Sequence, residues 1–272
     1  MKGMTAQDLE RGRFIRLHYS ADPEKDESWA KEERAKEADP RNWEKQMEMR
    51  RVVTDGIPVF ARYDDKKHCP EEFHSAPVPL TPGSNYFGGW DAGQTLSPAF
   101  ILLEFTPTLE VNVLLEVVSI SGESMDEFAP KVLQILTDRY PTVIGIIRHF
   151  GDATITTRSG PTKETAQEVA KKYGFNITPK TNVWDKRKSA VDHLLHAVKF
   201  KICGLLCPVL RRGFLGMYKF EISKSGESQG PGAVVMMPLK NAYSHIQDAL
   251  QYPSMVIYDE LLKTPSSNPW DW

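Results

Sequence analysis

The sequence predicts an α/β protein, because strand-like and helix-like segments alternate along residues 85–200. Three strand candidates come first, "YFGGWD", "AFILLEF" and "LEVNVLLEVVSI", together rich in Val, Ile, Leu and Phe. A helix is predicted next at residues 124–140, and its apolar residues have the spacing of one buried face: Phe128, Val132, Ile135 and Leu136. "TVIGIIRHFGD" is then typical of a strand covered on both faces, and helices are predicted at 161–174 and 189–200.

The chain divides into a lead-in, a main domain and a short tail. Residues 1–80 form a helical and irregular lead-in, the main domain is predicted at 81–262, and the tail at 263–272. A small antiparallel insertion is expected at about 201–240, because the strand-like segments "GFLGMYKFEIS" and "GAVVMMPLK" flank the flexible "KSGESQGPG".

The lead-in contains three predicted elements before its connector. "GRFIRLHYSADP" is strand-like and ends at Pro23. The acidic residues 22–39 favour a helix, and a second helix is predicted from Pro40, since proline suits the first helical position. The Pro-rich "HSAPVPLTPGS" has the composition of a connector.

Composition bounds the compartment and the class of partner. The 272 residues are 40% hydrophobic and 26% charged, which is ordinary for a soluble protein with one sizeable core. No apolar run approaches the ~20 residues of a membrane helix, the N-terminus lacks the apolar centre of a signal peptide, and three cysteines are too few for a disulfide framework. We therefore expect a soluble intracellular protein that is not secreted and contacts no membrane. The net charge of -2 argues against a generally basic nucleic-acid binder, although local basic patches can bind phosphate.

Two apolar segments end in the same way, at an aspartate beside glycine: Asp91 and Asp152. Burying an ionised carboxylate is unfavourable unless a positive partner meets it. Ligands of α/β sheets bind at the carboxyl ends of strands, where two adjacent strands would bring both aspartates into one crevice. A third carboxylate comes from the predicted closing helix "NAYSHIQDALQY", which is expected to end before Pro253 and carries His245 and Asp248 on one face.

Three converging carboxylates repel one another, and the repulsion raises their pKa values. A pair of hard divalent cations, Mg²⁺ or Mn²⁺, removes the conflict, because these ions prefer oxygen ligands. Two such ions about 4 Å apart can act on the attacking and leaving oxygens of a phosphoryl displacement. The alternative interpretation is structural, since aspartate is also a common turn and cap residue.

Longer segments around these residues resemble a known family. "GGWDAGQTLSPAFILLEF", "FGDATITTRSGPTKETAQEVAKKYGFNI" and "NAYSHIQDALQY" resemble the three nuclease motifs of large terminase subunits from tailed bacteriophages. "CPVLRRGFLGMYKF" is similar to the segment before the third motif, and "FIRLHYSADP" resembles the link that precedes the nuclease half. The likeness spans most of residues 12–260.

The resemblance implies a ribonuclease H-like mixed sheet flanked by helices, and an endonuclease that cuts concatemeric double-stranded viral DNA during genome packaging. It implies two divalent cations as cofactors, with Asp91, Asp152 and Asp248 as metal ligands and His245 in a supporting catalytic role. It also implies action in the host cell cytoplasm, with the terminase ATPase, the small terminase subunit and the portal as partners.

The chain departs from the family in one respect. The phosphate-binding motif of the motor ATPase, G-x-x-x-x-G-K-[ST], is not in this sequence, and "SGPTKET" at residues 159–165 lacks the glycine spacing. We therefore expect a nuclease fragment or a separate nuclease subunit, which is not the ATP-driven motor by itself.

Basic clusters provide candidate contacts to DNA. The candidates are Arg158, Lys186, Arg187, Lys188, Arg211 and Arg212. Phosphate contacts of this kind position a duplex without reading its sequence, so we expect little sequence preference and a strong dependence on salt.

Other functions and sites stay open. One rival is another ribonuclease H-like enzyme, such as a Holliday-junction resolvase or a transposase core, and another is a non-catalytic module that docks on DNA, portal or ATPase. A structural zinc site is a weaker hypothesis, from His68, Cys69, His74, Cys203 and Cys207. His193 and His196 are three residues apart, which suits a metal pair but suits a surface helix face better.

Overall fold

The computed structural model describes residues 19–36, 58–93, 97–119, 122–158, 164–197, 199–222 and 236–263. The chain divides into two compact units, Met1–Thr54 with Trp272, and Asp55–Asp271. In the first unit the predicted acidic helix is present as α2 (Glu27–Lys36), and a 3-10 turn, η1 (Tyr19–Ala21), stands where the end of a strand was predicted. The rest of that strand-like segment and the second predicted helix lie outside the described residues.

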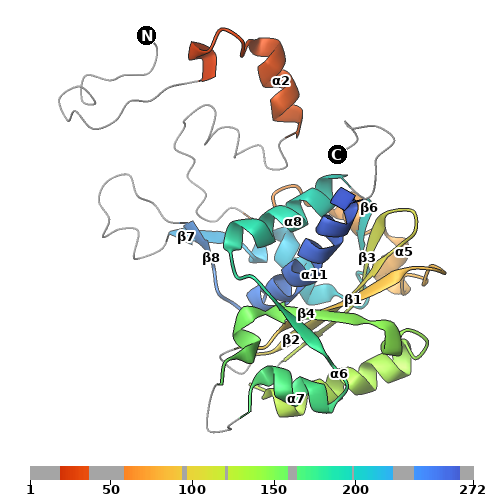
Figure 1. Ribbon diagram of the computed structural model, residues 1–272. Helices are drawn as coiled ribbons and strands as arrows, with labels where there is room; N and C mark the ends of the chain where they lie inside the picture. Colours follow the sequence, from red (N-terminus) through yellow and green to blue (C-terminus); the bar gives the residue numbers. More distant parts are fainter. Residues whose placement is uncertain are drawn as a thin grey trace. The chain divides into compact units, whose positions relative to one another are not determined.

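The second unit is built on a six-stranded mixed sheet in the order β5-β4-β1-β2-β3-β6 (Figure 1). β1, β2 and β3 are antiparallel neighbours, whereas β4 and β6 pair in parallel with β1 and β3, and β5 pairs in parallel with β4. The strands are β1 (Asn85–Asp91), β2 (Ala99–Phe105), β3 (Glu110–Val118), β4 (Arg148–Asp152), β5 (Ile177–Lys180) and β6 (Lys199–Ile202). The predicted α/β fold class is confirmed.

Helices cover both faces of the sheet (Figure 1). α8 (Trp184–Ala197) and α11 (Ser244–Lys263) lie on one face, and α6 (Met125–Arg139) and α7 (Ala166–Lys172) on the other. The short elements are α4 (Asp65–His68), α5 (Glu72–Ser75), η2 (Ile144–Ile146), η3 (Ala153–Thr156), α9 (Pro208–Arg212) and the π-helical turn η4 (Gly213–Met217). Within the described ranges no helix is both long and apolar enough to cross a membrane.

The predicted antiparallel insertion is present as a two-stranded sheet of β7 (Phe220–Ile222) and β8 (Met236–Pro238). It is narrower than 201–240, because Lys199–Ile202 forms the edge strand β6 of the main sheet, and α9 and η4 follow. Phe60 is buried in the core of the second unit.

Two element boundaries were predicted wrongly. β4 begins only at Arg148, where it first pairs with β1, and the apolar Ile144–Ile146 before it form a 3-10 turn with Ile146 exposed. The closing helix does not end before Pro253 but continues to Lys263. Proline disfavours a helix interior, yet buried residues on both sides of Pro253 pack α11 onto the sheet, and this packing outweighs the local preference.

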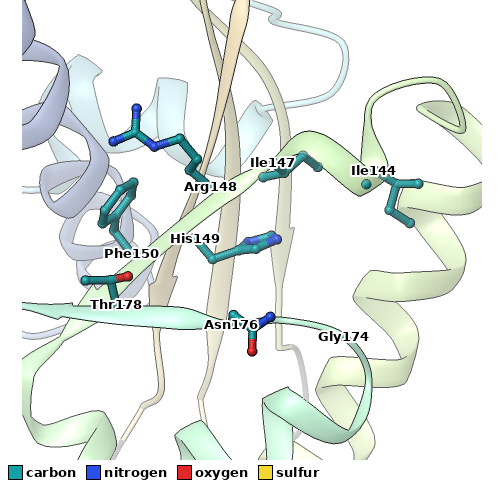
Figure 2. Close-up of a pocket in the computed structure, with 9 residues that line it drawn as sticks. Ile144, Ile147, Arg148, His149, Phe150, Gly174, Asn176 and Thr178 are labelled. Carbon is teal, nitrogen blue, oxygen red and sulfur yellow. The ribbon is translucent and has the colours of Figure 1, made fainter.

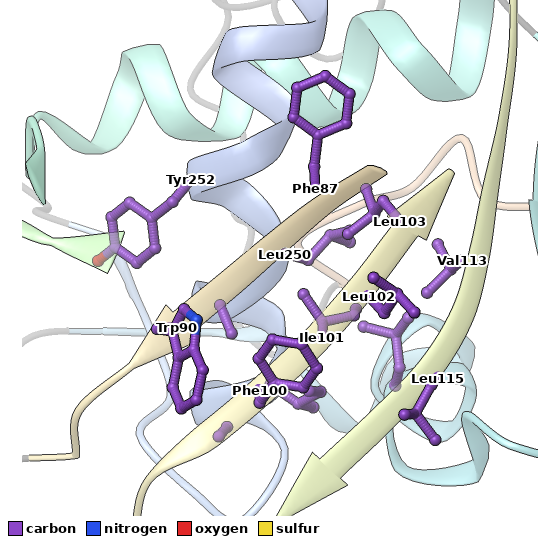
Figure 3. Close-up of a cluster of buried hydrophobic side chains, with 14 of the residues drawn as sticks. Phe87, Trp90, Phe100, Ile101, Leu102, Leu103, Val113, Leu115, Leu250 and Tyr252 are labelled. Carbon is purple, nitrogen blue, oxygen red and sulfur yellow. The ribbon is translucent and has the colours of Figure 1, made fainter. Parts of the chain in front are cut away.

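β1 alternates its residues between the two helical layers, as a strand must. Trp90 faces α6 and α7, where its ring contacts those of Phe128 and Phe175. Gly89 faces α11, and Asp91 shares that face. Figure 3 shows the buried side chains of the strands with those of α11, including Leu250.

Glycine at position 89 lets α11 approach the sheet closely. A Cβ atom there would lie 2.1 Å from the backbone oxygen of Ala249 and 2.9 Å from Cδ of Pro253. Real side chains do not tolerate such distances, so the helix can sit at this depth only over glycine. This contact places the first turns of α11 beside the carboxyl end of β1.

We expect Gly89→Ala to destabilise the second unit, because the added methyl group collides with backbone rather than with a flexible side chain. Overpacking of a core lowers the free energy of unfolding by roughly 1–3 kcal/mol or more. Urea unfolding followed by circular dichroism measures the loss. Gly145→Ala is the matched control, since a Cβ there meets no atom within 4 Å. Equal stability of the two variants would contradict this account of the contact.

Candidate active site

Asp91 and Asp152 lie side by side at one edge of the sheet. β1 and β4 are parallel neighbours, and their register pairs Trp90 with Gly151, directly before the two aspartates. Alternate residues of a strand share a face, so Asp91 points to the same side as Gly89, toward α11. The two strand ends therefore present their carboxylates together at the helix.

Asp91 is held by α11 and by the turn that follows β1. Its Oδ2 lies 2.9 Å from Nδ1 of His245, in the first turn of α11, and its Oδ1 accepts a hydrogen bond of 3.1 Å from the N–H of Gly93. Gly93 has a φ of +59°, a left-handed conformation that favours glycine. The hydrogen bond to Asp91 raises the pKa of His245, and burial opposes this effect.

Asp152 is oriented by two amide donors. Its Oδ1 accepts hydrogen bonds of 2.6 Å from the N–H of Thr154, which it caps at the start of η3, and of 2.6 Å from Nδ2 of Asn182. Asn182 lies two residues before α8, and its Oδ1 lies 3.5 Å from the hydroxyl of Tyr252 on α11. The side chain of Asn182 thus links the end of β4 to α11.

Asp248 is the most buried of the three carboxylates, with 5% of its side chain exposed. Nζ of Lys240 lies 2.5 Å from its Oδ2, and Nη1 of Arg187 lies 3.5 Å from its Oδ1. The hydroxyl of Tyr218 and Nε2 of Gln251 also donate to Oδ1, at 3.4 and 3.3 Å. Asp248 therefore has two cations and two neutral donors around it.

Electrostatic effects link Asp91 with Asp248, and all three carboxylates with Tyr252. Burial raises the pKa of Asp248, the charge of Lys240 opposes this, and the negative charge of Asp91 raises it further. Burial likewise raises the pKa of Tyr252, Arg187 lowers it, and the charges of all three aspartates raise it again. The Tyr252 hydroxyl thus lies within the electrostatic reach of every carboxylate of the candidate site.

The chemistry of these donors fits a hard divalent cation. Three carboxylates supply oxygen ligands, and the repulsion that Asp91 exerts on Asp248 is the conflict that a cation relieves. In the described part of the chain, no three His, Cys, Asp or Glu side chains already form a ligand set. Instead the carboxylates are engaged by protein donors, above all by Lys240, Arg187 and His245.

The predicted DNA contacts fall into two groups. Arg158, Lys186 and Arg212 are exposed. The other three are engaged within the protein: Arg187 at the carboxylate site, Lys188 with Asp192, and Arg211 with Asp65. Arg211 is bound bidentately, at 2.8 and 2.6 Å, so its guanidinium holds α9 to α4.

Sequence reasoning missed several residues of the site. Tyr252 carried a usable signal, because it lies four residues after Asp248 and so shares its helix face. Lys240 and Tyr218 carried none, since each reaches Asp248 from the region around β7 and β8 and not from a neighbouring position. Asn182 lies in a connection between a strand and a helix, without a pattern of its own.

The hypothetical zinc site is not formed. The ring nitrogens of His68 are taken by the N–H of Asp64 and the carbonyl of Leu195, and Nε2 of His74 by the carbonyl of Cys69. All three cysteines are buried and unbridged. In the other histidine pair, each Nδ1 has a protein partner of its own. Nδ1 of His193 contacts the Ser189 carbonyl, and Nδ1 of His196 accepts a hydrogen bond from the guanidinium of Arg62.

A pocket of about 560 Å³ lies at the other end of β4 (Figure 2). Its lining residues include Ile147, Arg148, His149 and Asn176. His149 accepts a hydrogen bond of 3.0 Å from Nε1 of Trp90, and burial lowers its pKa to about 4. Since Asp152 is at the opposite end of the strand, this pocket is separate from the candidate active site.

Comparison with known proteins identifies the fold. No family model and no curated protein matches the chain. Among solved structures, a large terminase from a thermophilic bacteriophage matches with a TM-score of 0.64 and 13% identity, over 93% of this chain and 58% of that chain. The chain has the fold of a bacteriophage large terminase. The predicted mixed sheet flanked by helices is thereby confirmed.

Two further solved structures of large terminases are similar to this chain. The same phage terminase in complex with ADP matches with a TM-score of 0.64 and 12% identity, over 96% of this chain and 58% of that chain. The large terminase nuclease from the thermophilic phage G20c with bound cobalt has a lower TM-score, 0.49, at 14% identity, over 77% of this chain and 99% of that chain. The present chain thus spans about 58% of the length of the first of these terminases.

The hydrogen bond between His245 and Asp91 predicts a raised pKa of His245, which can be measured. We expect the pKa of His245 in metal-free protein to lie above its ordinary value, and Asp91→Asn to lower it, because the variant removes the charge that favours the imidazolium. A folded-state pKa above the unfolded value stabilises the fold at low pH, and this contribution is lost as pH rises through the folded-state pKa. Histidine NMR titration in EDTA measures it. His149 is the internal control. An unchanged pKa of His245 in Asp91→Asn would contradict the role given to its hydrogen bond with Asp91.

Proposed function

We propose that this protein is a metal-dependent endonuclease that cleaves concatemeric double-stranded viral DNA during genome packaging. The observation that carries the proposal is that Asp91 and Asp152 end adjacent parallel strands, and that α11, which carries Asp248, contacts Asp91 through His245, within a fold shared with a large terminase. The sequence segments that resemble terminase nuclease motifs contribute the same three residues.

Each side chain has a proposed role. Asp91 and Asp152 would hold two divalent cations, and Asp248 would complete one coordination sphere. When bound, Mg²⁺ or Mn²⁺ would polarise the scissile phosphate and lower the pKa of water. His245 uses Nδ1 for Asp91, which leaves Nε2 to orient the attacking water or a phosphate oxygen. Hydrolysis would leave 5′-phosphate and 3′-hydroxyl ends.

The proposed partners follow from the fold and the charge distribution. Exposed basic residues, Arg158, Lys186 and Arg212, would contact duplex phosphates and give little sequence preference. The phage terminase of similar fold was solved in complex with ADP, whereas this chain contains no phosphate-binding loop motif. A terminase ATPase part or subunit is therefore a proposed partner, together with the small terminase subunit and the portal.

The first test is digestion of plasmid and linear duplex DNA in Mg²⁺, Mn²⁺ and EDTA. We expect cleavage only with metal, and a loss of at least about 100-fold in Asp152→Asn, since a metal ligand supports several kcal/mol of transition-state stabilisation. Asp185→Asn is the matched control, because it makes the same change at an exposed position of α8. Folding of each variant is checked by its melting temperature.

The outcomes separate the proposed function from its rivals. Cleavage by folded Asp152→Asn at the wild-type rate would refute the proposed metal site. A strong preference for branched DNA or specific ends would favour a junction resolvase or a transposase core. No cleavage together with no effect of metal on the melting temperature would favour a docking module.

Lys186→Gln tests the DNA surface. Binding to unrelated duplexes is expected to weaken by a similar factor, and the slope of log affinity against log salt to become shallower by about one. Fluorescence anisotropy across a salt series measures both. Lys199→Gln removes an exposed charge at the start of β6, on the other edge of the sheet, and is expected to change neither. Equal effects of the two variants would contradict a localised DNA surface.

A further inference from the structure

The two positively charged side chains at Asp248, those of Arg187 and Lys240, differ in how strongly the surrounding protein fixes them. The Arg187 side chain is 11% exposed, its guanidinium lies 5.7 and 5.3 Å from the ring centroids of Trp184 and Tyr252, and it donates to the Tyr252 hydroxyl at 3.0 Å. The Lys240 side chain is 68% exposed, and its ammonium contacts Asp248 at 2.5 Å. Lysine can leave the carboxylate for water without giving up packed contacts, whereas arginine cannot.

Lys240 stands at the base of the two-stranded sheet formed by β7 and β8. The residues on both sides of it are bonded to the facing segment: Leu239 donates its N–H to the carbonyl of Lys219 at 2.8 Å, and Nδ2 of Asn241 donates to the carbonyl of Met217 at 2.9 Å. The ammonium of Lys240 therefore attaches the base of this sheet to the buried carboxylate.

We propose that Lys240 and a divalent cation compete for Asp248, so that Lys240 sets the cation concentration at which the site fills. The inference rests on the proposed function, because it takes Asp248 as a metal ligand. An ammonium and a hard cation seek the same carboxylate oxygens, and the like charges of the two repel each other when both lie at contact distance from Oδ2. Metal binding releases Lys240, and the base of the β7–β8 sheet then loses one attachment. By linkage, an effect that stabilises the Lys240–Asp248 contact weakens metal binding by the same factor by which metal binding weakens that contact.

The test compares the wild-type chain with Lys240→Gln in a titration with Mn²⁺ alone, read as the rise in melting temperature. We expect the midpoint to fall about threefold to tenfold in the variant, because filling no longer requires displacement of a partly solvated ammonium. Lys219→Gln removes the same charge from the same region and is the matched control, with an unchanged midpoint expected. Asp248→Asn is expected to reduce the response in either background.

Hydrogen exchange provides a second readout that a merely structural lysine would not move. Mn²⁺ is expected to speed exchange of the Leu239 amide in the wild-type chain, although ligand binding more often slows exchange. In Lys240→Gln the same amide should exchange equally fast with and without Mn²⁺. Equal midpoints in wild type and Lys240→Gln, with a response that Asp248→Asn removes, would overturn the competition and leave the metal site standing. If Mn²⁺ changes the melting temperature of neither the wild-type chain nor any variant, the proposed function is overturned as well.

Discussion

The seating of α11 on β1 is the constraint on which the rest of the site depends. The backbone oxygen of Ala249 comes so close to Gly89 that no side chain could stand between them. Asp248 directly precedes Ala249 in the helix, so the contact that closes the core also buries this carboxylate. The same approach places His245, one turn earlier, against Asp91 at the end of β1. Gly89 thus allows α11 to bring Asp248 and His245 to a sheet edge that already carries two aspartates.

Burial of the Asp248 carboxylate is electrostatically unfavourable, and neighbouring side chains compensate for it. A buried carboxylate without a partner is strongly unfavourable, and removing one partner of a buried ion pair leaves an uncompensated charge. Arg187, Lys240 and the hydroxyl of Tyr218 together meet the carboxylate from three different segments. The positive charge near Asp248 must therefore be exchanged rather than lost. A divalent cation is a suitable replacement, because it supplies charge and ligand geometry at the same oxygens.

The sequence was informative where the determining pattern is local. Strand ends beside glycine and a helix face with His245 and Asp248 are short-range features, and the fold brings them together as expected of an α/β sheet. The run Lys186-Arg187-Lys188 shows the limit. Successive helical residues point about 100° apart, so Lys186 faces solvent, Arg187 turns into the site and Lys188 pairs with Asp192 on the same helix. All three were predicted to contact DNA, whereas the helical period places their side chains in three different surroundings. Contacts such as that of Lys240 depend on long-range pairing and leave no local pattern.

Because Arg187 is packed in place and Lys240 is largely exposed, Lys240 is the side chain that would leave Asp248 when a metal ion binds. If a divalent cation enters and the lysine ammonium leaves, the centre gains two positive charges and loses one. Arg187 stays in both states, because Trp184 and Tyr252 hold its guanidinium in place. Exchange of the lysine ammonium for one divalent cation makes the centre more positive by one charge. The second proposed cation adds two more, so a phosphodiester would be attracted more strongly to the loaded centre. Under the proposed competition, this balance favours metal loading before a phosphodiester binds.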